Sequence, residues 1–176
     1  MSIEKILSSA PVVPVVVIEK LEDAAPLARA LYNGGLKALE ITLRTPIAAE
    51  AVKLMKEAVP EAYVGTGTVI DKATFNASVE AGADFMVSPG VNDELLALAK
   101  ESDIPFLPGA ATPSEVMKLA SQGFKFLKFF PAEAAGGTAM LKSIGGPLPQ
   151  VTFCPTGGIS LETAPNYLAL KNVICV

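Results

Sequence analysis

Short apolar runs recur eight times along this chain of 176 residues, and stretches with helical spacing separate them. The runs begin roughly 20 to 26 residues apart and cover Val12–Ile18, Lys37–Leu43, Ala62–Gly67, Ala83–Ser88, Pro105–Pro108, Lys125–Phe130, Val151–Thr156 and Asn172–Val176. Strands that alternate with helices pair in parallel, because a parallel pair needs a crossover connection. Eight such units with nearly continuous apolar strands predict one domain over residues 1–176, an α/β protein that folds as a (β/α)8 TIM barrel.

The intervening stretches carry the spacing of amphipathic helices, as in Leu21–Tyr32 and Ile47–Ala58. In the first of these, Gly34 follows the last apolar residue, where it would end the helix. The i, i+3, i+4 positions of one helix face carry Leu21, Ala24, Ala25, Ala28, Leu31 and Tyr32. An open doubly wound sheet is the alternative fold, but its dinucleotide-binding fingerprint G-x-G-x-x-G does not follow the first apolar run.

Composition narrows the classes of protein to which the chain can belong. Apolar residues make up 51% and charged residues 18%, which excludes an intrinsically disordered chain. The formal charge is −4, so no surplus of positive charge supports sequence-independent nucleic-acid binding. The apolar run Pro11–Ile18 contains two prolines, is too short to span a membrane and lacks the flanks of a secretory leader. We therefore expect a soluble, cytoplasmic protein with neither a nucleic-acid nor a membrane partner.

The chain has no histidine, and this absence limits its chemistry. It excludes the Ser–His–Asp and Cys–His triads and every zinc site that needs imidazole, so we expect no metal site. The two cysteines, Cys154 and Cys175, do not make a disulfide framework. Proton transfer must therefore depend on Glu, Asp, Lys, Tyr or Cys.

The second apolar run ends in alternating polar residues. In a (β/α)8 barrel the reacting residues lie at the carboxyl ends of the strands. Residues 39–44 read Leu-Glu-Ile-Thr-Leu-Arg, and side chains of a strand alternate between two faces. The apolar positions suit the face under the helices, so Glu40, Thr42 and Arg44 would point into the barrel. Buried charges are costly unless they are paired or used. An ion pair between Glu40 and Arg44 is the purely structural alternative.

The sixth apolar run, Lys125–Phe130, places Lys128 between two phenylalanines of the same strand face. Burial among aromatic rings disfavours a charged amine, and the neutral amine is the nucleophile that Schiff-base chemistry requires. The alternative is a lysine that pairs with Glu40 or Glu133 and only stabilises the fold.

Glycine, threonine and proline end three further runs, in Gly65–Thr68, Ser88–Gly90 and Pro108–Gly109. Each segment is also compatible with an ordinary turn between a strand and a helix. Thr68 is the hydroxyl of most interest, because the neighbouring glycines let a ligand approach the backbone.

The seventh run leads into Thr156-Gly157-Gly158-Ile159-Ser160, directly before an expected helix. Bare N–H groups at a helix N-terminus bind anions, and barrels often hold a phosphate after the seventh and eighth strands. The segment therefore predicts an anion site, with a simple Gly-Gly turn as the alternative.

Five motifs in a fixed order carry a resemblance to a known family. They are Leu-Glu-Ile-Thr-Leu-Arg-Thr from residue 39, Gly-Thr-Gly-Thr-Val from 65, Val-Ser-Pro-Gly from 87, Phe-Leu-Lys-Phe-Phe-Pro-Ala-Glu from 126 and Phe-Cys-Pro-Thr-Gly-Gly-Ile from 153. Together they resemble the 2-keto-3-deoxy-6-phosphogluconate (KDPG) aldolases, also known as 4-hydroxy-2-oxoglutarate (KHG) aldolases. The resemblance implies a homotrimeric class I aldolase of the Entner–Doudoroff pathway, acting without a metal or other cofactor. It would cleave KDPG, a phosphorylated 2-keto acid, to pyruvate and glyceraldehyde 3-phosphate.

The resemblance also implies roles for individual residues. Lys128 would form the Schiff base and Glu40 would transfer protons. Arg44 would bind the substrate carboxylate, which suits the planar guanidinium. The remaining substrate-binding positions would be Thr68, Pro89, Phe130, Thr156, Gly157 and Gly158.

The family pattern continues past the eighth strand with a Gly-Gly-Ser turn, which completes the phosphate site, and with a terminal helix. This sequence stops at Val176, so we expect an incomplete carboxyl end of the domain and a polypeptide that continues. Two other functions remain as alternatives. One is a phosphosugar isomerase or epimerase that uses Glu40 and an anion site without a covalent step. The other is an inactive barrel that acts as an assembly module.

Overall fold

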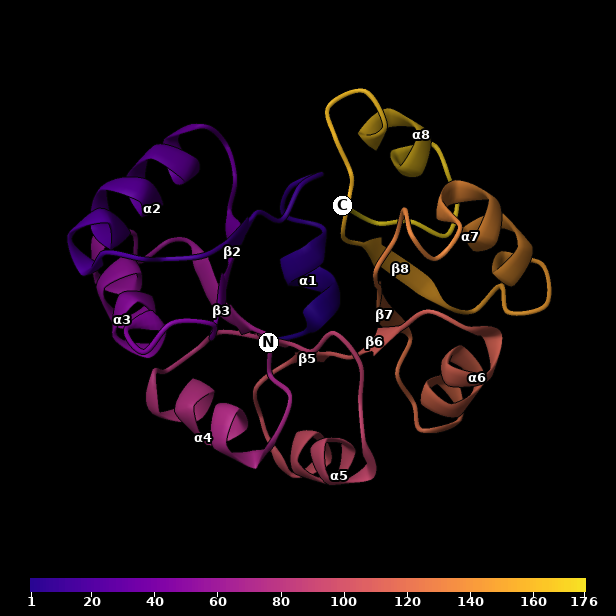
Figure 1. Ribbon diagram of the computed structural model, residues 1–176, viewed down its shortest axis with the longest axis horizontal. Helices are drawn as coiled ribbons and strands as arrows, with labels where there is room; N and C mark the ends of the chain where they lie inside the picture. Colours follow the sequence, from indigo (N-terminus) through magenta and orange to yellow (C-terminus); the bar gives the residue numbers. More distant parts are fainter.

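The computed structural model describes residues 1–176 and confirms the predicted barrel, in which parallel strands form a ring inside a layer of helices (Figure 1). Five strands pair in the order β1-β2-β3-β4-β5, and three pair in the order β6-β7-β8. The strands are β1 Val15–Val16, β2 Ala38–Thr42, β3 Tyr63–Gly67, β4 Met86–Val87, β5 Phe106–Leu107, β6 Gly109–Ala110, β7 Phe126–Phe129 and β8 Thr152–Pro155.

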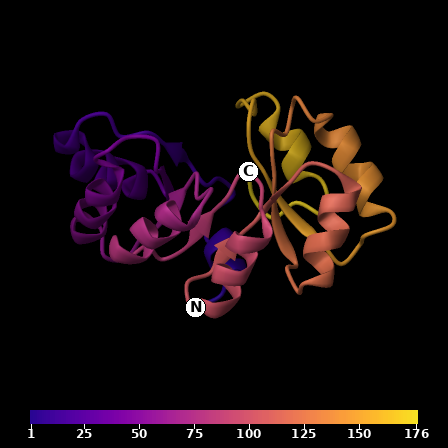
Figure 2. The ribbon, with the colours of Figure 1, turned by 60° about the horizontal axis from the view of Figure 1, so that its bottom comes forward.

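Two connections close the ring and exclude the open doubly wound sheet. Pro108, which has no N–H to donate, divides one barrel strand into β5 and β6; β5 pairs with β4, and β6 pairs with β7. The other connection lies between β8 and β1 and is made by the last residues of the chain. Phe153 of β8 forms a parallel bridge with Val173, and the amide of Val13, just before β1, donates to the carbonyl of Val176 over 2.8 Å. The last residues accordingly lie between the two halves of the chain (Figure 2).

Helices α2 to α8 surround the strands. The helices are α1 Ile3–Leu7, α2 Ala24–Asn33, α3 Ala48–Ala58, α4 Lys72–Glu80, α5 Asp93–Glu101, α6 Pro113–Ser121, α7 Gly137–Gly145 and α8 Ala164–Leu168. A 3₁₀ turn, Leu21–Asp23, forms the start of the helix predicted over Leu21–Tyr32. Gly34 ends α2 as predicted, but in the right-handed region, and the positive φ of 94° falls on Gly35. None of the helices is long and apolar enough to cross a membrane.

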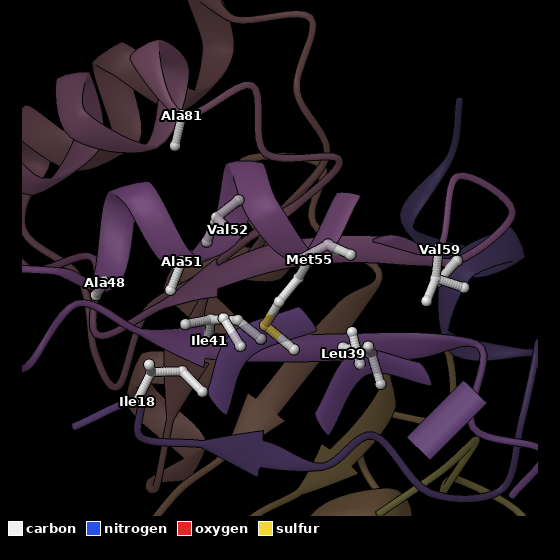
Figure 3. Close-up of a cluster of buried hydrophobic side chains, with 13 residues drawn as sticks. Ile18, Leu39, Ile41, Ala48, Ala51, Val52, Met55, Val59 and Ala81 are labelled. Carbon is white, nitrogen blue, oxygen red and sulfur yellow. The ribbon is translucent and has the colours of Figure 1, made fainter. Parts of the chain in front are cut away.

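The outward faces of the strands pack under the helices, as the alternation in residues 39–44 predicts. Leu39 and Ile41 of β2 are fully buried and point toward Val52 and Met55 of α3 (Figure 3). Because side chains of a strand alternate between two faces, the opposite face of β2 points into the barrel.

The short helix α1 closes one end of the barrel and was not predicted. Ile6 and Leu7 are buried in one apolar cluster with Cys154 of β8 and with Phe85 and Cys175. In Figure 1, α1 lies inside the ring of strands. Five residues are too few for a helical period to stand out from the sequence. Both cysteines are free thiols in this apolar cluster.

Candidate active site

Glu40 and Lys128 meet inside the barrel, below its open end. They come from β2 and β7, and Lys128 Nζ lies 3.2 Å from Glu40 Oε1 and 3.5 Å from Oε2. Glu40 is 4% exposed and Lys128 is 5% exposed. The two residues therefore form a buried ion pair, in which the attraction between the opposite charges offsets part of the cost of removing each charge from water.

Glycines on neighbouring strands make room for this pair. The strand register places Gly65 beside Glu40 and Gly109 beside Lys128. A side chain at Gly67 would overlap the carboxylate of Glu40, and one at Gly65 would overlap the ring of Phe85. The glycines that the sequence suggested as turn residues thus also hollow out the barrel interior.

The environment of Glu40 suits a group that exchanges protons. Burial raises the pKa of Glu40 above its ordinary value, while the nearby charges of Lys128 and Arg44 oppose that increase. A carboxyl group with a raised pKa can hold a proton closer to neutral pH than an exposed one.

The sequence left two ion pairs as purely structural alternatives, one between Glu40 and Arg44 and one between Lys128 and either Glu40 or Glu133. Glu40 pairs with Lys128 and not with Arg44, so the alternative of a Glu40–Arg44 ion pair is wrong. Lys128 does pair with Glu40, whereas Glu133 accepts a hydrogen bond from the hydroxyl of Tyr167.

Arg44 lies at the rim and is held by Thr68. Arg44 Nε donates to Thr68 Oγ1 over 3.1 Å, and this leaves the outer nitrogens of the guanidinium for another acceptor. Thr68 is the one non-glycine residue with a positive φ, 61°. That conformation is unusual for a β-branched residue, and such strain concentrates at functional sites.

A cavity of about 530 Å³ opens above the ion pair at the carboxyl ends of the strands. Six predicted site residues line it: Arg44, Lys128, Phe130, Thr156, Gly157 and Gly158. Lys128 Nζ lies 5.5 Å from the centroid of the Phe130 ring. Apolar residues, among them Val13, Val15 and Ile159, form another part of the wall.

Pro89 lies apart from this cavity. It lines a smaller cavity of about 190 Å³, which shares only Phe130 with the larger one. The backbone of Pro89 packs against Gly109, where a side chain would overlap it. Pro89 can thus support the strand that neighbours Lys128 without lining the main cavity.

The turn after β8 differs from the expected helix N-terminus. Helix α8 begins only at Ala164, and the amides of Ser160 and Thr163 donate to hydroxyls of the same segment. By contrast, the amides of Gly157, Gly158 and Ile159 donate to no group in the chain. Gly157 and Gly158 have φ values of 106° and 79°, which only glycine adopts readily. The free N–H groups at this cavity therefore belong to the turn and not to a helix.

No three side chains of His, Cys, Asp or Glu gather closely enough to hold a metal ion. The groups at the cavity are instead one buried amine, one buried carboxylate, a guanidinium, a threonine hydroxyl and free amides. An amine beside a carboxyl group can form and hydrolyse an imine, and the cationic rim suits an acidic substrate.

Comparison with known proteins identifies the family. Residues 3–176 match the family described as KDPG and KHG aldolase. The chain belongs to this family. The resemblance seen in the sequence motifs is thereby confirmed, and the chain is an aldolase.

Individual relatives match along almost the whole of this aldolase. The KHG/KDPG aldolase of Escherichia coli K12 is 51% identical, over 99% of this chain and 82% of the relative. The 2-dehydro-3-deoxy-phosphogluconate aldolase of Dickeya dadantii is also 51% identical, over 99% of this chain and 82% of the relative.

Two solved structures of similar aldolases contain small molecules. The KDPG aldolase of Legionella pneumophila, with pyruvate captured at low pH as a covalent carbinolamine intermediate, has a TM-score of 0.96 and 50% identity. The match covers 98% of this chain and 84% of the Legionella pneumophila chain. The 2-keto-3-deoxy-6-phosphogluconate aldolase of Zymomonas mobilis ZM4 with 3-phosphoglycerate has a TM-score of 0.95 and 47% identity, with coverage of 98% and 82%.

One pair near the site was missed by the sequence reasoning. Glu133 is the last residue of the Lys128 motif, and the sequence suggests it only as a partner for Lys128, while nothing in the sequence points to Tyr167. The two side chains join the loop after β7 to α8. Their 34-residue separation carries no local pattern that could have revealed the contact.

Proposed function

We propose that this chain is a class I aldolase that reversibly cleaves KDPG to pyruvate and glyceraldehyde 3-phosphate and also acts on 4-hydroxy-2-oxoglutarate. The observation that carries the proposal is the buried amine of Lys128 in contact with the carboxylate of Glu40, under a cavity with a cationic rim. The names of the relatives in Escherichia coli and Dickeya dadantii support the same substrates.

Lys128 is the proposed nucleophile. Its neutral amine attacks C2 of the substrate, the carbonyl oxygen takes a proton, and the resulting carbinolamine loses water to give an iminium ion. The C3–C4 bond then breaks as the C4 hydroxyl loses its proton, and the electron pair moves toward the iminium nitrogen. This step releases the aldehyde and leaves an enamine, which is protonated at C3 and hydrolysed to pyruvate.

Glu40 is the proposed acid and base for these steps. Its carboxylate oxygen, 3.2 Å from Lys128 Nζ, can accept the proton that the amine must lose before it attacks. Its raised pKa also lets it return a proton when water leaves and when the enamine is protonated. A water molecule between Glu40 and the substrate would relay protons to atoms that the side chain does not reach.

The rim residues are proposed to bind the two ends of the substrate. Arg44, held by Thr68, would receive the carboxylate beside C2. Phe130 would shape the space for the pyruvyl half, and the Pro89 backbone would support this space from behind, by packing against Gly109 beside Lys128. The unpartnered amides of Gly157 and Gly158 would bind the anionic group of the aldehyde half, as successive N–H groups bind anions in other turns.

Reduction with borohydride in the presence of pyruvate tests the covalent step. We expect a stable adduct on the peptide that contains Lys128, no adduct in Lys128→Arg, and an unchanged adduct in Lys125→Arg, which alters an exposed lysine near the start of the same strand. Arginine keeps the charge but cannot form the imine. A wild-type chain that turns over KDPG without forming this adduct would favour chemistry without a covalent step.

The proposal extends to a homotrimer that acts in the cytoplasm, supported by the family to which the sequence belongs. Sedimentation equilibrium tests the assembly. A particle with the mass of three chains is expected, and a monomer at micromolar concentration would contradict it.

A further inference from the structure

Glu133 joins the loop after β7 to the turn after β8. Its amide donates to the carbonyl of Gly157 over 3.1 Å, and the neighbouring amide of Ala132 donates to Thr156 over 2.8 Å. A side chain at Gly158 would lie 2.9 Å from Glu133 Cβ and Cγ. Glu133 therefore fixes the position of the turn whose free amides lie at the substrate cavity.

Tyr167 of α8 determines where the Glu133 carboxylate lies. The Tyr167 hydroxyl donates to Glu133 Oε1, and Tyr167 is 1% exposed. Burial, together with the adjacent carboxylate, raises the pKa of Tyr167, so the hydroxyl keeps its proton and remains a donor. Gly137 leaves room for this contact, since a side chain there would lie 3.2 Å from the hydroxyl.

The hydrogen bond holds the carboxylate on the far side of the turn. Glu133 and Tyr167 line a second cavity of about 410 Å³ together with Gly136, Thr138 and Asn166. Neither residue lines the 530 Å³ cavity above Lys128. The exposed part of Glu133 would be free to turn if Tyr167 released it, because no other side chain bonds its carboxylate.

We propose that Tyr167 is a positioning residue that holds the negative charge of Glu133 away from the substrate cavity and so keeps the Gly157–Gly158 turn able to accept an anionic substrate group. This inference rests on the proposed function, because it concerns the aldehyde half of the substrate. In the proposed function the pyruvyl half binds at Lys128 and Arg44 and the turn binds the other half, so the reaction of pyruvate with Lys128 should not depend on Tyr167.

Three variants test the inference through the KM for KDPG. In Tyr167→Phe the freed carboxylate repels the phosphate, and we expect KM to rise about fivefold while kcat changes little. In Glu133→Gln the amide oxygen still accepts from Tyr167 and KM stays near the wild-type value. The double variant Glu133→Gln/Tyr167→Phe has no charge to release, so its KM returns close to that of the wild type. Tyr32→Phe in α2 is the matched control.

Salt provides a second measurement, because a charge effect is screened and a packing defect is not. We expect the rise in KM of Tyr167→Phe to shrink at high ionic strength. An unchanged KM in Tyr167→Phe, or a double variant as impaired as Tyr167→Phe, would overturn the inference. KM does not depend on the fraction of folded enzyme, so partial loss of stability cannot produce the expected result.

Pyruvate trapping separates this inference from the proposed function. Tyr167→Phe should form the borohydride adduct at Lys128 as the wild type does. A wild-type chain that forms no adduct overturns both proposals, whereas normal trapping with equal KM values in all variants overturns only the role of Tyr167.

Discussion

Glu40 and Gly67 share one space inside the barrel: the carboxylate of Glu40 lies where the side chain of residue 67 would be. The two residues belong to adjacent strands, β2 and β3. The missing side chain at Gly67 is therefore a condition for the contact between Glu40 and Lys128.

Gly67→Ala should displace Glu40 from Lys128. An added methyl group in a closely packed interior costs about 1–3 kcal/mol, and we expect a matching decrease in the free energy of unfolding together with a loss of turnover. Chemical denaturation and steady-state kinetics measure the two effects. Gly146→Ala is the control, since the nearest atom there is 3.6 Å from the added carbon. Full activity in Gly67→Ala would show that Glu40 need not lie in its present position.

The raised pKa of Glu40 predicts how stability depends on pH. A carboxyl group whose pKa is higher in the folded chain binds its proton more tightly there. Its contribution is fully present below its ordinary pKa of 4.5 and is lost as pH rises through the folded value. We expect the wild type to lose stability relative to Glu40→Gln as the pH rises above 4.5 toward the raised pKa of Glu40.

Denaturation curves of the two proteins across this pH range measure the difference. Glu57→Gln, an exposed position on α3, is the control and should run parallel to the wild type. Parallel curves for Glu40→Gln as well would contradict the pKa shift.

Arg44→Lys should weaken binding of the substrate carboxylate. Lysine keeps the charge but loses the two-pronged geometry and the hydrogen bond to Thr68. Hydrogen bonds to charged groups are worth about 1.5–3 kcal/mol, so KM for pyruvate in the proton-exchange reaction should rise by about tenfold or more. Arg29→Lys, in which the exposed arginine of α2 bonds a backbone carbonyl, should leave KM unchanged. Equal losses for pyruvate and for an aldehyde without a carboxylate would mean that Arg44 acts on the fold alone.

Thr68→Gly should separate stability from function. Relief of the left-handed conformation should raise the free energy of unfolding by about 1 kcal/mol. The same change removes the hydroxyl that holds Arg44, so KM should rise. Thermal unfolding and kinetics on one sample measure both effects. Thr152→Gly, in β8 without a positive φ, should destabilise the chain instead. A destabilised Thr68→Gly would show that no strain is stored at this residue.

The alternation of side chains along strands carried most of the correct predictions. It placed Leu39 and Ile41 under the helices and Glu40 and Lys128 inside the barrel. When the apolar face of a barrel strand packs under the helices, the side chains of its other face must point into the barrel. Eight repeats of strand and helix were sufficient to predict closure into a barrel.

Other features depend on contacts that no local pattern encodes. The partner of Glu40 lies 88 residues away, so the alternation of strand faces alone left both Arg44 and Lys128 as possible partners. The start of α8 at Ala164 follows from hydroxyl groups of Ser160 and Thr163 that bond the turn's own amides, which disfavours an earlier helix start. Pro89 resembles a pocket residue in sequence, yet its backbone packs on Gly109 beside a separate cavity.

Helix α1, which fills one end of the barrel with Ile6 and Leu7, has a consequence for the order of events in the proposed reaction. With that end blocked, molecules can reach Lys128 only through the opposite mouth. The pyruvyl fragment remains bonded to Lys128 at the bottom of this passage, and the aldehyde lies between it and the solvent. The aldehyde must therefore depart first and pyruvate last, and in the synthetic direction pyruvate must enter before its partner.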